Sequence, residues 1–167
     1  MTGPYGTIET SDDGSYVLRY ERRLRHPVEK VWTALTDPAR MEEWWARAAV
    51  LELTEGGRAR IEWLNGDAVA VGHVTRLEPP HAIEFDTDIH GRLLWELRPD
   101  EDGTHLTLTV TNAIPDEYRA KVLAGWHVHL DFLEDALDGR PVDWENWPED
   151  RWQVHHDRYE ASMRPMS

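Results

Sequence analysis

The sequence predicts an α+β protein in which a curved antiparallel sheet of seven strands wraps around one long C-terminal helix. Three observations lead to this class. Several segments between residues 15 and 112 alternate apolar and polar residues with a period of two. Short turns separate consecutive strands, which favours antiparallel neighbours. One long amphipathic segment follows, between Pro115 and Gly139, and it must bury its apolar side against the sheet.

The first strand is expected at residues 15–24, where apolar side chains occupy alternate positions. Two short helices then interrupt the strands. Pro27 suits the first turn of a helix, and the apolar residues from Val28 to Leu35 follow at helical spacing. Asp37 and Pro38 end this helix and begin the second, whose apolar stripe reaches Trp45.

Six further strands are expected between residues 49 and 112, joined by short turns. Asn65-Gly66 is typical of a hairpin turn. In the next strand Val69, Val71 and His73 are in phase, so we expect His73 to point inward, with a bulge near Gly72.

The chain is expected to divide into three parts. Residues 1–14 are polar and glycine-rich, which indicates a flexible arm. Residues 15–140 form a single domain. Residues 141–167 form a C-terminal extension that packs on the domain, with one more short helix from about Pro148.

Composition narrows the classes of function. The net charge of −14 repels phosphate, so nucleic acid is not an expected partner. No run reaches the roughly 20 apolar residues of a membrane span. The chain lacks cysteine, which excludes disulfides and a thiol nucleophile. Its first residues lack the features of a signal peptide, and a cytoplasmic location is expected. No cofactor is predicted.

Four stretches carry a family resemblance, and they cover most of residues 16–139. They are "HPVEKVWTALTDPARMEEWW" (26–45), "GHVTRLEPPHAIEF" (72–85), "LLWELRPDEDGTHLTLTV" (93–110) and "GWHVHLDFLEDAL" (125–137). They resemble the activator of heat-shock-90 ATPase homologue family, within the START-like (SRPBCC) superfamily. The resemblance implies the helix-grip fold. Two departures are Asn112, where many relatives carry histidine, and the tail beyond Gly139, which the resemblance does not cover.

Two histidines in the long helix suggest a metal site, but their spacing argues against one. His127 and His129 are two residues apart, roughly 200° around a helix, so they point to opposite sides and cannot chelate one ion. We therefore predict no metal. No catalytic residue is predicted either, because none of the four serines lies in a nucleophile-elbow context. His127 is expected to face solvent or the helix flank, and His129 to look toward the sheet. Gly125 is expected to let the helix approach the sheet closely.

A sheet curved around a helix leaves a gap that suits a small ligand. Its expected lining is aromatic and apolar, with two histidines: Trp32, Trp63, His73, Phe85, Trp95, Val122, Trp126 and His129.

Three functions remain open from the sequence. The first is binding of a small hydrophobic molecule in this gap, without catalysis. The second is a regulatory or chaperone-associated interaction, which the family name suggests, and a homodimer is also open. The third is a cyclase- or hydrolase-like enzyme, as some superfamily relatives are, with His129 and His73 as its ionisable groups.

Overall fold

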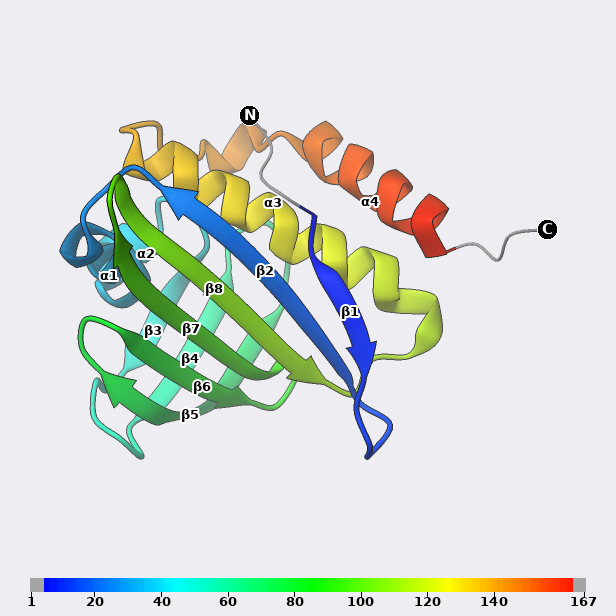
Figure 1. The fold of residues 1–167 in the computed structure, drawn as a ribbon, viewed down its shortest axis with the longest axis horizontal. Coiled ribbons are helices and arrows are strands. Elements are labelled where there is room, and N and C mark those ends of the chain that lie inside the picture. The colour runs from blue at the N-terminus through cyan, green and yellow to red at the C-terminus, as the bar shows by residue number, and fades with distance from the viewer. Residues whose placement is uncertain (1–4, 164–167) are drawn as a thin grey trace.

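The computed structural model describes residues 5–163 and arranges their strands in one antiparallel sheet (Figure 1). In chain order the elements are β1 (Thr7–Thr10), β2 (Tyr16–Leu24), α1 (Val28–Thr36), α2 (Pro38–Met41), β3 (Ala46–Leu51), β4 (Arg58–Trp63), β5 (Val69–Glu78), β6 (Ala82–Thr87), β7 (Gly91–Asp100), β8 (Gly103–Asn112), α3 (Arg119–Leu137) and α4 (Glu149–Met163). Single 3-10 turns at Asp116–Tyr118 and Trp144–Asn146 precede the last two helices.

The predicted α+β, helix-grip architecture is confirmed, with one strand more than expected. The strands of the described chain lie in the order β1-β2-β8-β7-β6-β5-β4-β3. The additional strand is β1, which pairs antiparallel with the Tyr16–Arg19 half of β2. It lies inside the segment that we expected to be a flexible arm. Residues 1–4 of that segment lie outside the described residues.

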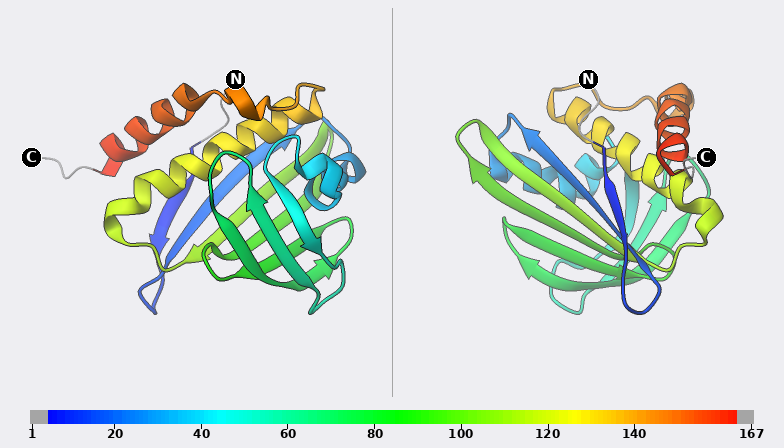
Figure 2. Two further views of the ribbon diagram at one scale, coloured as in Figure 1. Left: turned by 180° about the vertical axis from the view of Figure 1, so that it is seen from behind. Right: turned by 45° about the vertical axis from the view of Figure 1, so that its right-hand side comes forward.

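The domain has three layers, with α3 in the middle (Figure 2). One side of α3 lies on the concave face of the sheet, and α4 packs against its other side. α4, which lies in the predicted extension beyond Gly139, thus contacts α3. α3 consequently buries residues all around its axis, and His127, Val128 and Asp131 are as inaccessible as Leu130. His127, expected at the solvent or the helix flank, is fully buried because Tyr5 and α4 cover it.

The phase of β5 differs from the prediction. Ala70 and Val74 face the core, whereas Val71 is 46% exposed. His73 is exposed on the outer side, opposite Arg58 and Asp86 of the neighbouring strands. The inward orientation predicted for His73 is therefore wrong. The register shifts between Val74 and Arg76 instead of near Gly72.

Gly72 has a steric role in the sheet. A Cβ atom there would lie 1.9 Å from the carbonyl oxygen of Asp86 in β6. We expect Gly72→Ala to push β5 away from β6 and to lower the unfolding free energy by about 1–3 kcal/mol, measured by urea denaturation. Gly66→Ala is the control, because its added methyl group meets no atom within 4 Å. Equal losses at both glycines would contradict this assignment.

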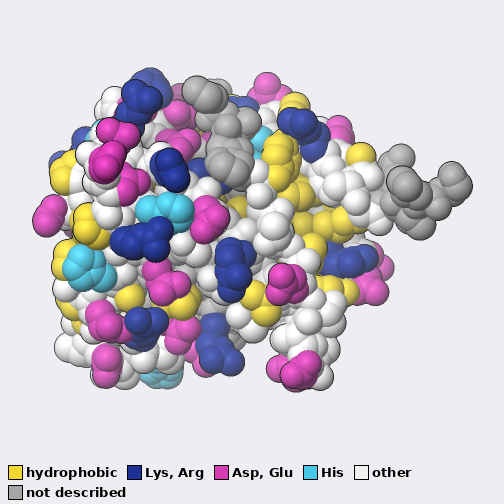
Figure 3. All heavy atoms as spheres, in the orientation of Figure 1, with side chains coloured by type: hydrophobic (Ala, Val, Ile, Leu, Met, Phe, Trp, Pro, Cys, Tyr) yellow, Lys and Arg dark blue, Asp and Glu magenta, His cyan; other side chains and the backbone are white. Residues whose placement is uncertain are grey.

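The outer face of the sheet is polar. Basic and acidic side chains are intermixed over the face shown in Figure 3. Among the described residues, no helix has the length and hydropathy required to cross a membrane.

Candidate ligand-binding site

Seven rings form one continuous aromatic cluster between the sheet and α3. It comprises Trp44, Trp45, Trp63, His90, Trp95, Trp126 and His129. Trp45 is central, with ring centroids 6.0 Å from Trp63, 6.0 Å from Trp95 and 5.8 Å from Trp126. Most of the rings meet edge to face or tilted, as aromatic pairs prefer. The cluster is therefore a packed wall, and it occupies the gap that was predicted to hold a ligand.

One face of α3 closes this cluster. Val122, Gly125, Trp126 and His129 follow at i, i+3, i+4 and i+7 and so share a side of the helix. Trp126 and His129 are buried, whereas Val122 and Gly125 are partly exposed. A Cβ atom built on Gly125 meets no heavy atom within 4 Å. Gly125 thus borders open space at the rim of the cluster, and the close approach to the sheet that we expected there is not observed.

Five ring nitrogens of the cluster are buried without a hydrogen-bond partner in the described chain. They are Nε1 of Trp45, Trp63 and Trp95 and Nε2 of His90 and His129. Buried polar atoms are normally paired, and each unpaired one costs about 1–3 kcal/mol. By contrast, the Trp44 indole donates to the Ala34 carbonyl at 2.8 Å. The cluster therefore offers five ring nitrogens that could form hydrogen bonds with the polar groups of a bound molecule.

The hydrogen bond of His129 fixes which of its nitrogens carries the proton. Nδ1 lies 2.7 Å from the Gly125 carbonyl oxygen. A carbonyl only accepts, so Nδ1 donates and Nε2 presents a lone pair. Burial lowers the pKa of His129 to about 4 and that of His90 to about 4. Both rings are neutral at pH 7, and His129 Nε2 is an acceptor among indole donors.

The predicted site residues divide into three groups. Trp63, Trp95, Trp126 and His129 belong to the cluster, and Trp63 forms its partly exposed edge. Phe85 is buried in the core on β6, while Trp32 and Val122 pack against the edge of the core. His73 lies on the opposite side of the sheet and cannot act together with His129.

Sequence reasoning did not place Trp44, Trp45 and His90 in the site. The two tryptophans had been recognised as an apolar stripe, and both are fully buried just after α2. His90 belongs to the turn between β6 and β7, and nothing in the sequence of that turn indicates that its ring reaches α3.

Two hollows on the surface of residues 5–163 are separate from the cluster. The larger, of about 1140 Å³, lies between β2, the β7–β8 turn and the end of α3. Its lining is mainly charged, and the smaller hollow lies beside the turn that contains cis-Pro80. Neither is lined by tryptophan, so neither matches the predicted apolar site.

A curved antiparallel sheet, a long helix along its concave face and a buried aromatic cluster between them define a helix-grip protein. Within that class, the chain belongs to the family described as activator of Hsp90 ATPase homolog 1-like protein, whose model matches residues 25–138. The match includes the whole aromatic cluster and ends before α4.

Solved structures with the same fold include CalU16 from Micromonospora echinospora, at 26% identity over 96% of each chain with a TM-score of 0.69. DynU16, a protein in the dynemicin biosynthetic locus, is 26% identical over 75% of this chain and 48% of its own, with a TM-score of 0.67. MLL2253 from Mesorhizobium loti is 27% identical over 75% of this chain and 99% of its own, with a TM-score of 0.66. No curated protein matches the chain.

Proposed function

We propose that this protein binds a small, mainly aromatic molecule at the cluster between α3 and the sheet. The observation that supports this most is the group of five unpaired ring nitrogens within one apolar wall. Ligand sites in proteins combine apolar area with a few convergent polar atoms, and this cluster has both. The open space at Gly125 is the side from which a ligand would approach.

The polar atoms define the ligand's chemistry. The indole N–H groups of Trp45, Trp63 and Trp95 donate, so they favour carbonyl or ether oxygens. His129 Nε2 accepts, so it favours a hydroxyl group. A hydroxylated aromatic compound supplies both kinds of partner and also stacks on the tryptophan rings.

Entry of a ligand requires the rim to move, because the rings are in contact. Trp63 and His90 are the partly exposed members, and their ring centroids are 4.9 Å apart. His90 lies on a turn, and Trp63 is the last residue of β4. Movement of these two side chains away from Trp126 would open the cluster next to Gly125.

One of the similar structures has a stated biosynthetic context. DynU16 is described as a protein in the dynemicin biosynthetic locus. By analogy, this chain would bind a product or intermediate of a biosynthetic pathway, and the inference that this ligand is aromatic rests on the tryptophan cluster alone. Binding without catalysis remains the proposal, since His73 is on the far side of the sheet and the predicted histidine pair is not formed.

Probe binding tests the proposal directly. We expect 1-naphthol to quench tryptophan fluorescence and to bind about tenfold more tightly than 1-methoxynaphthalene, because only the hydroxyl can donate to His129; tenfold corresponds to about 1.4 kcal/mol. Native mass spectrometry of the freshly purified chain should show a co-purified small molecule.

Gly125→Leu is the matched variant. It fills the open space at the rim, and replacing a helical glycine favours the helix. We expect it to abolish naphthol binding without lowering the unfolding free energy. If neither naphthalene derivative binds and no small molecule co-purifies, the ligand-binding function fails, and capture of a protein partner by the native chain would then favour the chaperone-associated alternative.

A further inference from the structure

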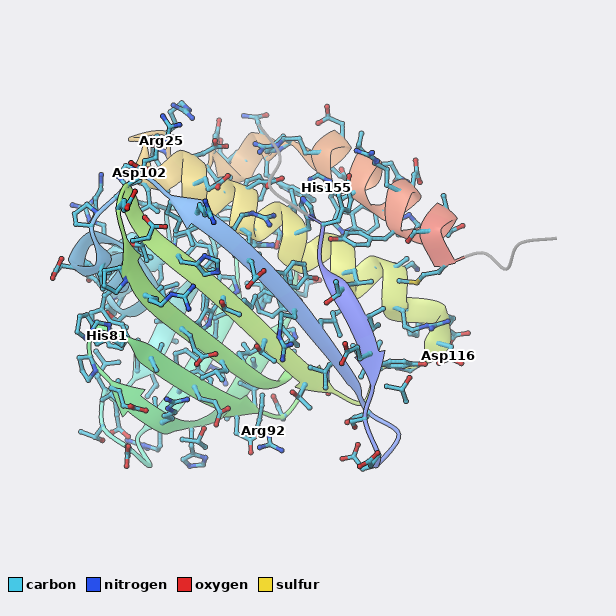
Figure 4. All side chains as sticks on the ribbon, in the orientation of Figure 1. Arg25, His81, Arg92, Asp102, Asp116 and His155 are labelled. Carbon is cyan, nitrogen blue, oxygen red and sulfur yellow. The ribbon has the colours of Figure 1, made fainter. Side chains whose placement is uncertain are left out.

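A second group of polar side chains lies on the other side of α3, away from the aromatic cluster. His127 and Asp131 come from α3 and His155 from α4, and all three side chains are buried. One nitrogen or oxygen atom from each lies within 4.8 Å of the other two. Figure 4 shows His155 on α4 directed toward α3. We propose that these three residues form a binding site for a divalent transition metal that joins α4 to α3.

The ligand set suits such an ion. Two imidazoles and one carboxylate are typical ligands of Zn²⁺, Fe²⁺ and similar metals, whereas Mg²⁺ and Ca²⁺ prefer oxygen ligands. His127 and Asp131 are four residues apart, so they lie one above the other on α3. His155 Nε2 is 2.8 Å from Asp131 Oδ2, and His127 Nε2 is 3.9 Å from Asp131 Oδ1. His127 Nε2 has no hydrogen-bond partner in the described chain.

The outer nitrogens of both rings already have partners of the kind found around metal sites. Tyr159 Oη lies 2.7 Å from His127 Nδ1, and Tyr5 Oη lies 3.4 Å from His155 Nδ1. The backbone N–H of Gly6 donates to Tyr159 Oη and fixes its position. Each ring could carry its proton on Nδ1, donate it to a tyrosine oxygen, and present Nε2 to the metal. Metal binding then requires the His155 proton to move from Nε2 to Nδ1, and neither histidine has to lose its proton.

Nearby charges set the strength of the site. Arg22 NH2 is 3.6 Å from Asp131 Oδ1, and Arg151 NH2 is 3.9 Å from Asp131 Oδ2. Both guanidinium groups oppose a dication. Arg22 approaches Oδ1, and the metal would bind Oδ2 in the position now taken by the His155 proton, with Arg151 nearby. We expect the wild type to bind the metal with moderate affinity and Arg151→Gln to bind it severalfold more tightly. A purely structural role of the three residues would not produce this gain.

Cobalt is the test ion, because Co²⁺ held by nitrogen and oxygen ligands absorbs strongly in the visible when four-coordinate. The full chain, treated with chelator and dialysed, is titrated with Co²⁺ and with Zn²⁺, and bound metal is measured by equilibrium dialysis. We expect one ion per chain, a visible cobalt spectrum that Zn²⁺ removes, and a higher melting temperature with metal. The absence of bound metal and of a cobalt spectrum in the wild type would overturn the proposal.

Variants locate the ion. In His155→Gln, the glutamine amide can still donate a hydrogen bond to Asp131. Circular dichroism verifies that this variant is folded. We expect the variant to lose the cobalt spectrum. The control is His156→Gln, because His156 and Glu160 form an i, i+4 pair on the outer part of α4, with 3.3 Å between Nε2 and Oε2. Loss of metal binding in His156→Gln, with binding retained in His155→Gln, would assign the ion to the surface and overturn the proposal.

Discussion

Replacement of Asp131 by alanine is expected to lower the unfolding free energy by about 3–5 kcal/mol, measured by urea denaturation in the presence of chelator. Asp131 faces the Arg22 guanidinium, and both side chains are at most 1% exposed. It also accepts the hydrogen bond from His155 of α4. Burial alone would raise the pKa of Asp131, but the His155 hydrogen bond and the nearby His127 and Arg22 lower it. The carboxylate is therefore charged, and its removal leaves the arginine charge in the interior without this counterion.

Two comparisons separate this effect from the loss of an ordinary ion pair. Asp138 lies just after the same helix, and its half-exposed carboxylate Oδ1 is 2.7 Å from His26 Nε2. Asp138→Ala should lower the unfolding free energy by less than about 1 kcal/mol. The double variant Arg22→Met/Asp131→Leu replaces both charges with apolar side chains and should recover most of the lost stability. An Asp131→Ala variant as stable as Asp138→Ala would show that the buried pair contributes little.

Local sequence patterns were sufficient to predict the main elements of the fold. Pro27 and Val28–Leu35 predicted α1, and the apolar stripe that ends before Gly139 predicted α3. Gly139 has φ of +87°, a conformation that ends helices and favours glycine. These features depend on neighbours in the chain, so they can be recognised without knowledge of the tertiary structure.

Features that depend on distant segments could not be predicted in the same way. His127 was expected at the solvent or the helix flank because α3 was treated as a helix with one covered side. α4 and Tyr5 cover the second side, and nothing in the local sequence around His127 shows this. The spacing argument for His127 and His129 was correct, since the two rings point to opposite sides. Asp131, at i+4 from His127, was overlooked as a member of a site. The third member of that site, His155, lies in a later segment, and the local sequence around His127 does not indicate it.

The error at His73 has a different origin. Alternation predicts two faces of a strand but does not say which one is buried when both carry valine. In β5 the small residue Ala70 faces the core, and Val71 faces outward. The register shift after Val74 then changes the phase within the strand. A face assigned from side-chain size alone is therefore unreliable here.

Replacement of Trp45 by alanine is expected to lower the unfolding free energy by about 3–5 kcal/mol, the usual loss when a buried large aromatic is truncated. Trp45 is 1% exposed and contacts four other tryptophans, so its removal leaves a cavity in the centre of the aromatic cluster. Urea denaturation at pH 7 measures the loss. Trp152→Ala is the control, since Trp152 is partly exposed and stacks on His156 of the same helix.

The cavity gives this variant a second, more specific result. An apolar cavity in a protein core stays empty and binds a small aromatic molecule of matching size. We therefore expect added indole to restore part of the stability of Trp45→Ala, in proportion to its concentration, and to leave Trp152→Ala unchanged. Rescue would show that the surrounding rings keep their positions when the central one is absent, and that the space between α3 and the sheet accepts an aromatic guest. A stability loss without any rescue by indole would instead mean that the remaining rings collapse into the space, which would count against a ligand site at this place.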